Sequence, residues 1–475
     1  MPRSILVACS ALLILSGMGY ADTYYVSTTG DDAWPGSQTQ PWLTLQHAAG
    51  EAGAGDEVVV QSGTYVGFRA MSAGTAGAPV TFRAAAGAAV VVNGPGPQSW
   101  HGSVINVEGY DWWVIEGLEV TGATSAAGID IREADHVTVR HCHCHHNRKW
   151  GIFTGFAEYF TAEDNECNDS TDEHGIYHSN SGDHAVIRFN YCHHNRSSGI
   201  QINADPSMGG DGISSYCVVD RNVLEANGAG GAAGVNLASL RDSEITNNLF
   251  YGNLAGGIAM WDDGQGEEWG CRNNLIAHNT IHMPSTGRWT INMINGSSGN
   301  RIINNILMHD GGKAGLETDS SSLSGLIMDY NILTRVSLDD TWLTLAEWQS
   351  GYGRDLHSAT RAPADTFVAP GSDYHLLESA WAVDHGPVLA EVTQDLDGAA
   401  RPQGASSDIG CYEHPAAPVP GDINGDGFAD GADALILAHH LAGNPAGYPV
   451  TPAVADLDGD GSVTVVDLLW LMQAG

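Results

Sequence analysis

The chain contains very little positive charge. Its 475 residues include 19 lysines and arginines against 56 acidic residues, which gives a formal net charge of −37. Lysine is almost absent and occurs only at Lys149 and Lys313. This balance argues against nucleic acid as a partner, because phosphate backbones are bound by clustered basic side chains. A polyanionic ligand could bind only where the few basic residues gather.

Long apolar runs are missing beyond the amino terminus, so no later stretch is long enough to cross a bilayer. Residues 1–21 combine Arg3, an apolar run from Ile5 to Leu15 and a small-residue exit at Ala21. This is the pattern of a cleaved secretory signal peptide, which predicts an extracellular protein. Seven of the eight cysteines lie beyond Cys9 in this leader, and their odd number favours buried thiols over a disulfide framework.

A glycine followed by an apolar residue recurs through the middle of the chain, at spacings of 23, 24, 24, 35 and 23 residues. The pairs are Gly128-Ile129, Gly151-Ile152, Gly175-Ile176, Gly199-Ile200, Gly234-Val235 and Gly257-Ile258. Such a period indicates a solenoid, in which each unit buries its apolar side chains against its neighbours. The units read as short alternating strands between Gly, Asn and Asp turns, so the repeat is β rather than helical.

A second strand recurs in register with the first, beginning with residues 139–147. Aligning the repeats places Cys144, Cys167, Cys192, Leu224 and Phe250 in one inward column. The position two residues earlier gives Cys142, Asn165, Asn190, Asn222 and Asn248, and the turn gives Asn147, Ser170, Asn195, Asn227 and Asn253. We expect these polar columns to form hydrogen-bonded ladders. The predicted fold is an all-β, right-handed parallel β-helix, a single-stranded solenoid with rungs of about 24 residues.

Two segments resemble the ends of a known fold. The stretch from Tyr24-Tyr25-Val26-Ser27 to Gly63-Thr64-Tyr65 is similar to the amino-terminal cap of secreted pectate-lyase-like β-helix proteins. The stretch Asp408-Ile409-Gly410-Cys411-Tyr412-Glu413 resembles the segment that closes many of them. The resemblance implies a β-helix over residues 22–414. This scaffold supports lyases, glycoside hydrolases, epimerases and non-enzymatic surface proteins, so it does not define an activity.

The carboxyl terminus carries a duplicated acidic loop after a Pro-rich linker at residues 415–421. The spacing of its oxygen ligands is that of an EF-hand-like calcium loop, and each copy opens an apolar helix. The predicted ligands are Asp422, Asn424, Asp426, the Phe428 carbonyl, Asp430 and Asp433, then Asp456, Asp458, Asp460, the Ser462 carbonyl, Thr464 and Asp467. Residues 422–475 resemble a type I dockerin, which implies two calcium ions and a cohesin-type protein partner. The loops depart from the dockerin pattern at positions 10 and 11, where Gly431-Ala432 and Val465-Val466 stand.

Two insertions, at residues 203–215 and 261–270, follow equivalent strands two rungs apart, so we expect both to rise on one face of the solenoid. They would place Asp205, Asp211, Trp261, Asp262, Asp263, Glu267 and Glu268 at the rim of a groove. Stacked strands about 4.8 Å apart offer a long row of side chains to an extended polymer. Polysaccharide is therefore the expected ligand.

The rungs before these insertions concentrate positive charge, with 6 of the 19 basic residues and 10 of the 21 histidines between Arg132 and Arg196. This concentration suits a uronate polymer. Outward positions on the main strands read Asp130, Phe153, Tyr177, Gln201 and Asn236, and Lys149, Glu173 and His174 lie at the preceding corner. The alternative is purely structural: Arg148, Asp172 and Arg196 are one rung apart, as are Lys149 and Glu173, so inter-rung ion pairs would explain all five. His178 falls in an inward column and is expected to be a core residue.

We favour an enzyme of the polysaccharide lyase type, because proton removal next to a carboxylate needs a tuned base and nearby cations. The resemblance implies Lys, Arg, His or Tyr as the base, with Arg or calcium neutralising the carboxylate. The expected catalytic residues are Lys149, His174, Tyr177 and Arg196, and the expected substrate-binding residues are Arg148, Glu173, Gln201, Asp205, Trp261, Asp262 and Asp263. A third calcium ion could lie among Asp205, Asp211, Asp262 and Asp263.

Three alternatives stay open. Paired rim carboxylates would instead make a glycoside hydrolase. A protein that only binds glycan at a surface would need neither the lyase residues nor the paired carboxylates. As a further alternative, His141, His143 and His145 alternate along a predicted strand and could bind Zn²⁺ or Cu²⁺ with Asp164, Glu166 and His193. We expect a monomer.

Overall fold

The computed structural model describes residues 21–180, 182–415, 420–424, 429–443 and 450–474. The predicted signal peptide, most of the predicted linker, and the predicted ligands Asp426 and Phe428 lie outside these residues. The chain divides into two compact units. The first extends to Arg401 and includes 406–413, and the second comprises 402–405 and the residues from His414 onward.

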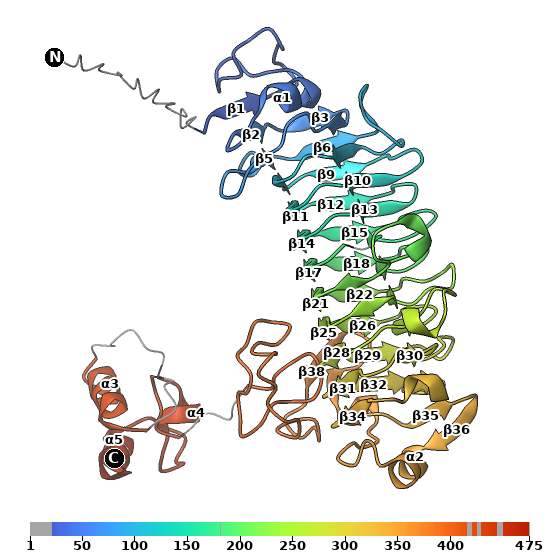
Figure 1. Cartoon of the computed structure of the whole chain (residues 1–475). Helices are drawn as coiled ribbons and strands as arrows, with labels where there is room; N and C mark the ends of the chain where they lie inside the picture. The colour runs from blue at the N-terminus through green and yellow to red at the C-terminus, as the bar shows by residue number, and fades with distance from the viewer. Residues whose placement is uncertain (1–20, 181, 416–419, 425–428, 444–449, 475) are drawn as a thin grey trace, which may run out of the picture. The chain divides into compact units, whose positions relative to one another are not determined.

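Three long sheets make up the first unit, and consecutive strands of the chain pass from sheet 1 to sheet 2 to sheet 3 before the next rung begins (Figure 1). Sheet 1 contains β1 (Thr23–Val26), β2 (Glu57–Val60), β5 (Val80–Ala84), β8 (Trp113–Glu116), β11 (Thr138–Arg140), β14 (Thr161–Glu163), β17 (Val186–Arg188), β21 (Val218–Asp220), β25 (Glu244–Thr246), β28 (Leu275–Ala277), β31 (Arg301–Ile303) and β34 (Ile327–Asp329). Sheet 2 contains β3 (Gly63–Tyr65), β6 (Val90–Asn93), β9 (Glu119–Thr121), β12 (His143–His145), β15 (Glu166–Asn168), β18 (Tyr191–His193), β22 (Val223–Glu225), β26 (Leu249–Tyr251), β29 (Thr280–Met283) and β32 (Ile306–His309). Sheet 3 contains β4 (Phe68–Arg69), β7 (Ile105–Glu108), β10 (Ala127–Arg132), β13 (Trp150–Gly155), β16 (Ile176–Ser179), β19 (Ile200–Asn203), β23 (Val235–Ala238), β27 (Ile258–Trp261), β30 (Ile291–Met293), β33 (Leu316–Thr318), β35 (Arg335–Leu338) and β36 (Thr341–Thr344).

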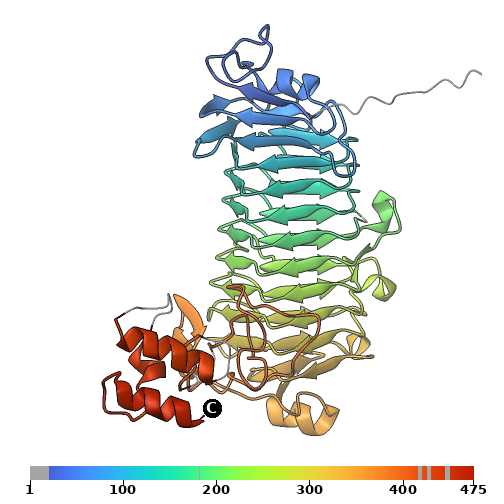
Figure 2. The same ribbon diagram turned by 90° about the vertical axis from the view of Figure 1, so that its left-hand side faces the viewer.

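The rungs are stacked in parallel, which confirms the predicted β-helix (Figure 2). Each complete rung has three strands, so the predicted second strand is in fact two. The chain bends between β11 and β12 at His141, whose φ of 53° lies in the left-handed region. The prediction that His141, His143 and His145 share one strand is therefore wrong, and only the last two lie in β12.

The repeated glycine exists because the rungs approach each other closely at the start of sheet 3. A Cβ atom on Gly151 would lie 2.7 Å from the carbonyl oxygen of Gly175, and a Cβ on Gly175 would lie 2.7 Å from that of Gly199. Any larger residue would push neighbouring rungs apart. The sequence period thus marks a steric requirement of the stacking.

Asparagine side chains form the predicted ladder between sheets 1 and 2. Their amides donate from Nδ2 to Oδ1 of the next rung at 2.9 to 3.1 Å in the series Asn165, Asn190, Asn222, Asn248, Asn279, Asn305 and Asn331. A second ladder joins Asn195, Asn227 and Asn253. These amides are buried, and the ladders therefore satisfy polar groups that water cannot reach.

The long ladder ends on a buried carboxylate. Asp355 accepts from Asn331 Nδ2 at 3.1 Å and from Trp348 Nε1 at 2.9 Å. Burial raises the pKa of Asp355 to about 6, despite the hydrogen bonds from Ser358, Asn331 and Trp348. The charged end of the ladder thus lies inside the carboxy-terminal end of the helix.

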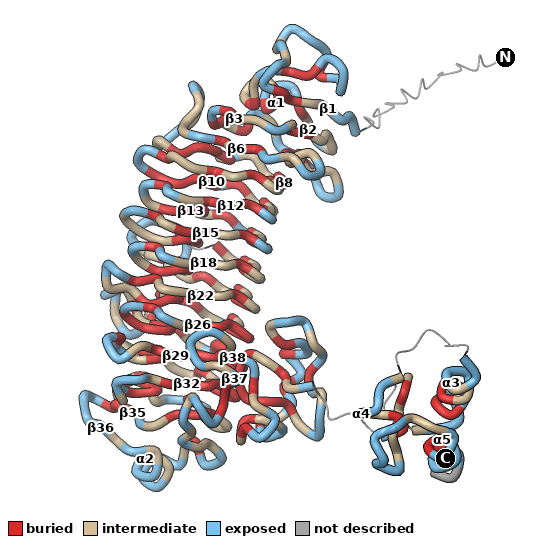
Figure 3. The backbone as a smooth tube through the Cα atoms, turned by 180° about the vertical axis from the view of Figure 1, so that it is seen from behind, coloured by how far each residue is buried: buried red, intermediate tan, exposed pale blue. Residues whose placement is uncertain are grey.

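The core inside the solenoid is continuous from rung to rung (Figure 3). Cys144, Cys167 and Cys192 are paired in register within it, followed by Leu224 and Phe250 as predicted. All seven cysteines in the described part of the chain are buried and free of disulfide bonds. His178 is also a core residue, bonded to Thr154 Oγ1 at 2.7 Å and the Gly182 carbonyl at 3.0 Å.

Helices cover both open ends of this core, where unpaired strands would otherwise be exposed. Helix α1 (Leu45–Glu51) contributes Leu45 and Ala48 at the amino-terminal end, and α2 (Leu345–Tyr352) contributes the fully buried Trp348 at the other. The terminal strand β36 pairs antiparallel with β35. Short 3₁₀ turns lie at η1 (Pro206–Met208), η2 (Glu267–Trp269), η3 (Ser320–Ser322) and η4 (Pro363–Asp365).

The segment after η4 folds back over sheets 1 and 2. It contains the hairpin of β37 (Phe367–Ala369) and β38 (Asp373–Leu376). A separate small sheet, outside this segment, pairs β20 (Ser214–Ser215) with β24 (Leu240–Arg241). Apolar residues of this closing segment pack on Leu249 and Ile306 of sheet 2 and on Leu275 of sheet 1.

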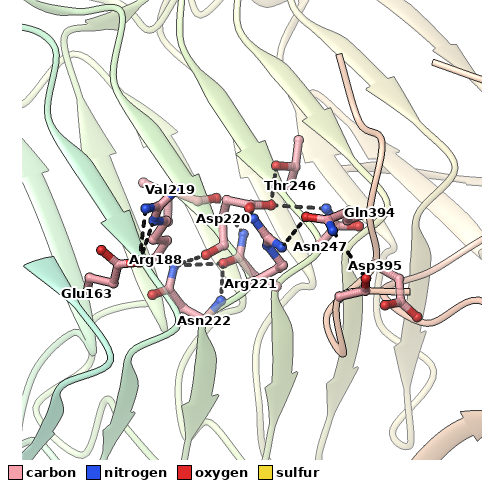
Figure 4. A network of polar contacts seen from close by, with 12 residues as sticks. Glu163, Arg188, Val219, Asp220, Arg221, Asn222, Thr246, Asn247, Gln394 and Asp395 are labelled. Carbon is pink, nitrogen blue, oxygen red and sulfur yellow. Dashed lines mark hydrogen bonds and ion pairs between the residues drawn. The ribbon is translucent and has the colours of Figure 1, made fainter. Parts of the chain in front are cut away.

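Polar contacts fix the same closing segment against the rungs (Figure 4). Arg221 donates to Gln394 Oε1 at 3.0 Å, and Arg401 donates to Asn247 Oδ1 at 3.1 Å. The Arg401 guanidinium also pairs with Glu413 at 2.6 Å, and both side chains are fully buried. A buried charge left without its partner is costly, so this pair holds the segment in one position. The closing segment thus packs on sheets 1 and 2.

The second unit is helical, with α3 (Gly431–Leu441), α4 (Pro452–Ala455) and α5 (Val465–Ala474). Helices α3 and α5 pack around a small core that includes Leu437 and Leu471. No helix within the described residues combines the length and apolar character that a membrane span requires.

The asparagine ladder generates a stability prediction. In Asn222→Ala, the backbone N–H and Nδ2 of Asn190 lose their shared acceptor, and the Ile187 carbonyl loses a donor. Because these groups are buried, we expect the free energy of unfolding to fall by about 2 to 5 kcal/mol. Denaturant unfolding followed by tryptophan fluorescence measures this change. The matched Asn93→Ala change removes an exposed amide and should have an effect below about 0.5 kcal/mol, and equal effects of the two variants would contradict the role of the ladder.

Candidate functional site

The outer face of sheet 3 presents a straight column of side chains, one from each rung. Strand pairing places Asp130 beside Phe153, then Tyr177, Gln201 and Asn236, as the sequence predicts. Ile129 and its equivalents point to the core, so these alternate residues point outward. The site is built on rigid strands rather than on loops.

An aromatic cluster lies on this face outside the solenoid core. The rings of Trp150 and Phe153 stack with centroids 4.3 Å apart, and Tyr177 meets them edge-on at 5.7 and 5.4 Å. Sequence analysis did not single out Trp150. Its position directly before Gly151, two residues before the inward Ile152, is the signal that would have shown it to be outward.

Cationic groups surround the aromatic cluster. The Arg132 guanidinium lies 4.4 Å from the centre of the Phe153 ring and is held by the fully buried Asp130 carboxylate at 2.8 Å. On the other side, Lys149 Nζ lies 5.0 Å from the Trp150 ring. Arg132 and Asp130 act as a fixed pair, which the sequence analysis did not include among the site residues.

The corner before the sheet contains the inter-rung ion pairs that the structural alternative predicts. Arg148 pairs with Asp172 at 2.6 Å, and Lys149 pairs with Glu173 at 3.3 Å. The pairs are partly exposed, so each contributes little stability and can exchange for a ligand. Arg196 differs: it is exposed, and its guanidinium has no ion-pair partner among the residues that the structure describes.

Glu173 also connects this corner to the aromatic cluster. Its Oε2 accepts from Trp150 Nε1 at 2.8 Å, while its Oε1 faces the Lys149 ammonium group. One carboxylate therefore orients both the lysine and the indole.

His174 is a weak base in this environment. Burial lowers the pKa of His174 to about 3, so the imidazole is neutral at physiological pH. Its Nδ1 accepts from the Ser198 backbone N–H at 3.1 Å, so the proton of the neutral ring is on Nε2. His174 can therefore donate a hydrogen bond from Nε2.

Tyr177 keeps its proton. Burial is the main cause of its raised pKa, with contributions from Asp263 and Glu173, and hydrogen bonding with Ser179 and Asn203 opposes the shift only in part. The Tyr177 ring meets the His174 ring at 5.2 Å. In the next rung, the buried Gln201 accepts from Asn236 Nδ2 at 2.8 Å.

The two insertions lie together, as expected. Asn203, at the end of β19, donates to Asp263 Oδ2 at 2.9 Å, which connects the start of the first loop to the second. A Cβ on Gly212 would lie 2.7 Å from the ring of Trp269, so the two loops also pack closely. They stand beside the carboxyl ends of the sheet 3 strands, where Trp261 ends β27.

The rim carboxylates are largely engaged within these loops. Asp262 is buried and accepts from Asn295 Nδ2 and from the backbone N–H groups of Gly264 and Gly266. Burial alone would raise the pKa of Asp262, but these hydrogen bonds outweigh it and lower the pKa. Asp205 caps η1 by accepting from Ser207 N at 2.8 Å. Both side chains thus support loop structure.

The carboxy-terminal loops provide the clearest ligand cluster. Asp456, Asp458 and Asp460 have carboxylate oxygens within 4.8 Å of one another, and no other trio of this kind occurs among the described residues. Asp467, at the twelfth position, accepts from the backbone N–H of Leu457 and Asp458, and Asp433 does the same for Ile423 and Asn424. Converging carboxylates in a short loop fit a hard cation such as Ca²⁺.

Comparisons with known proteins agree with this architecture. Residues 24–170 match the family model described as Pel9A-like, right handed beta helix region, and residues 99–269 match the model of the periplasmic copper-binding protein NosD. Residues 420–474 match the dockerin type I domain. No curated protein sequence matches the chain.

The solved structure of a pectate lyase shows the same fold. Pectate lyase Pel9A is 17% identical with a TM-score of 0.59, and the match covers 84% of this chain and 98% of that one. A rhamnogalacturonan lyase is 14% identical with a TM-score of 0.45, covering 74% and 91% of the two chains. The chain consists of a right-handed parallel β-helix of the pectate-lyase type and a carboxy-terminal type I dockerin, a calcium-binding module.

Proposed function

We propose that the outer face of sheet 3 binds an extended, uronate-containing polysaccharide and cleaves it by β-elimination. The observation that carries this proposal is the combination of the aromatic cluster of Trp150, Phe153 and Tyr177 with Lys149 and Arg132 on a protein of net charge −37. Tyr177 is the partly exposed ring of this cluster and suits the apolar face of a sugar, whereas Trp150 and Phe153 are buried and pack against it. Local cations suit uronate carboxylates. Pectate lyase Pel9A, which has the same fold, supports the class of substrate.

The surroundings of Tyr177, His174 and Lys149 indicate a different role in the reaction for each. Tyr177 retains its proton, which suits a general acid, whereas His174 is too weak a base at neutral pH and suits a hydrogen-bond donor. Lys149 is the remaining candidate for the base. It would take the proton on the carbon next to the uronate carboxylate, the C–H electron pair would form the new C=C bond, and the glycosidic oxygen would leave with the proton of Tyr177.

Arginine and loop side chains complete the proposed site. Arg196, which is exposed and free of ion pairs among the described residues, would neutralise the uronate carboxylate, and Arg148 could exchange its exposed partner Asp172 for a substrate group. The proposed substrate contacts from the other rungs and the loops are Glu173, Gln201, Trp261 and Asp263, whereas the expected contacts Asp205 and Asp262 instead hold loop structure. The proposed substrate is a polymer that the protein would meet outside the cell. The signal-peptide pattern of residues 1–21 and the dockerin both agree with export.

A hydrolase would use the rim acids instead, but Asp262 is the acid most completely occupied by structural hydrogen bonds. A paired acid and base for hydrolysis need one carboxyl group available to a water or a sugar. Glu267 and Glu268 are exposed, so the preference for elimination rests on the sheet 3 residues and not on an absence of available rim acids.

The elimination proposal is tested by incubating the full chain with pectate, alginate, chondroitin and neutral glycans, with and without chelator. Ultraviolet absorbance of unsaturated uronate ends should rise with one uronate polymer. We expect Lys149→Ala and Tyr177→Phe to lower this rate by about 10²- to 10⁴-fold, the usual range for loss of a general base or acid.

Two matched variants control for indirect effects. Lys313→Ala removes the other lysine of the chain, and Tyr159→Phe removes an exposed phenol, so both should retain activity. Reducing ends without absorbance would show hydrolysis in place of elimination. Silence in both assays would contradict the proposed cleavage.

We further propose that the second unit binds a cohesin-type partner through α5. This helix exposes Val465, Val466, Leu469, Trp470 and Met472, whereas the exposed large apolar residue on α3 is Leu435. Exposed apolar side chains on one helix are typical of a docking surface. Val465 and Val466 occupy the two loop positions that depart from the dockerin pattern, so they would set the choice of cohesin.

Calcium and partner binding should be lost together. Asp456→Asn with Asp460→Asn removes two carboxylates of the described cluster, so we expect weaker Ca²⁺ binding by calorimetry and loss of calcium-dependent capture by an immobilised type I cohesin. Asp365→Asn changes an exposed acid of the first unit and should alter neither quantity. Retained calcium affinity in the double variant would contradict the assignment of the ligands.

A further inference from the structure

The outer column of sheet 3 continues beyond the proposed site toward the amino-terminal rungs. Strand pairing runs from Phe153 through Asp130 and Asn106 to Arg69, which is the outward residue of β4. Arg69 and Tyr177 are therefore four strand spacings apart, or about 19 Å. The proposed reaction uses no residue of β4 or β7, so this stretch of the face has no assigned role.

The loop that leads into β7 lies on this stretch of the outer face. Asn106, the outward residue of β7, is buried, and its Oδ1 accepts from the backbone N–H of Trp100 at 2.8 Å. Ser103, in the same loop, is also buried and donates from Oγ to Asp130 Oδ2 at 2.8 Å. Two residues of the sheet 3 column thus fix the loop, and one of these contacts is made by Trp100 itself.

Trp100 and Arg69 form a stacked pair on this face. The guanidinium carbon of Arg69 lies 3.1 Å from the centre of the Trp100 ring, and Trp100 is 40% exposed. The backbone of Arg69 is held by Gln46, whose side-chain amide bonds to both the N–H and the carbonyl of Arg69. No carboxylate of the described residues pairs with the Arg69 guanidinium.

A guanidinium that stacks on a ring can still bind an anion. Its N–H donors lie in the plane of the group, so stacking fixes that plane and leaves the donors at its edge. Two parallel donors match the two oxygens of a carboxylate. The exposed part of an indole ring suits the apolar face of a sugar. The pair therefore offers both of the contacts that one uronate unit needs.

We infer that Trp100 and Arg69 form a distal binding site for a uronate unit of the same polymer chain that is cleaved at Tyr177. This inference rests on the proposed elimination. A sugar unit of an extended chain advances by about one strand spacing, so a chain that reaches both places contains at least about five units. Long stretches of polymer would therefore bind better than short oligomers, through a contact far from the reacting bond.

The test is steady-state elimination by the full chain on size-fractionated oligomers of pectate, alginate and chondroitin. We expect kcat/KM to rise with length until the oligomer reaches about six units. Trp100→Ala should raise KM about 10-fold on oligomers longer than about eight units and leave kcat unchanged, because a contact made equally in the ground state and the transition state affects KM alone. On oligomers of about three units, the variant should match the unaltered chain.

Three further variants separate ring, charge and general effects. Trp34→Ala removes an indole of similar exposure, 38%, from the loop after β1 and should change neither constant. Trp100→Tyr keeps an aromatic ring and should stay within about 3-fold of the unaltered KM. Arg69→Gln removes the charge, so it should raise KM on long oligomers and make KM less sensitive to salt.

A binding measurement without turnover distinguishes this site from the reaction itself. In the Lys149→Ala background, Trp100→Ala should weaken calorimetric binding of the long oligomer about 10-fold, and Trp34→Ala should not. Absence of ultraviolet absorbance with the unaltered chain would refute the elimination. Equal affinities of the Trp100→Ala and Trp34→Ala chains for the long oligomer would overturn the distal site, as would an equal rise in KM on short and long oligomers.

Discussion

The larger unit depends on one constraint, the close parallel stacking of each rung on the next. At the glycine column a rung approaches its neighbour so closely that a single Cβ atom would meet a backbone carbonyl at 2.7 Å. The asparagine ladders need the same close spacing between rungs. Each side-chain amide donates to the asparagine side chain of the following rung and to a backbone carbonyl of the preceding rung. The register that results aligns every outward residue into columns. A functional surface on this fold is therefore formed by side chains from several successive rungs and not by one loop.

This stacking also explains how an acidic protein can assemble a local cationic site. Lys149 comes from the corner of one rung, Glu173 and His174 from the next, and Arg196 from a third. The closing segment covers parts of sheets 1 and 2 through apolar packing and the buried Arg401–Glu413 pair. On the outer side of strands β10 to β19, Trp150 and Phe153 are buried, while Lys149 and Tyr177 are partly exposed and Arg196 is exposed.

The architecture could be predicted from the sequence because its signals are periodic. The glycine spacing, the cysteine column and the Asn222 ladder follow from a single alignment of the repeats, and the structure confirms them. The roles of individual site residues were harder to predict from the sequence. Asp262 lies in a rim loop and was expected to contact substrate, but its carboxylate accepts hydrogen bonds from the Gly264 backbone and from the Asn295 side chain. The loop conformation and the approach of Asn295, 33 residues further along the chain, follow no repeat in the sequence. The bend at His141 was also missed, although histidine is among the non-glycine residues that are enriched at positive φ.

The most direct test is a crystal structure of the Lys149→Ala variant with a uronate oligosaccharide from the polymer that it binds. The account predicts sugar rings on the outer face of sheet 3, running along the stacked rungs, with a carboxylate near Arg196 and a glycosidic oxygen within hydrogen-bond distance of the Tyr177 hydroxyl. An oligosaccharide bound to sheet 1 or sheet 2, with no contact to the Tyr177 column, would contradict it.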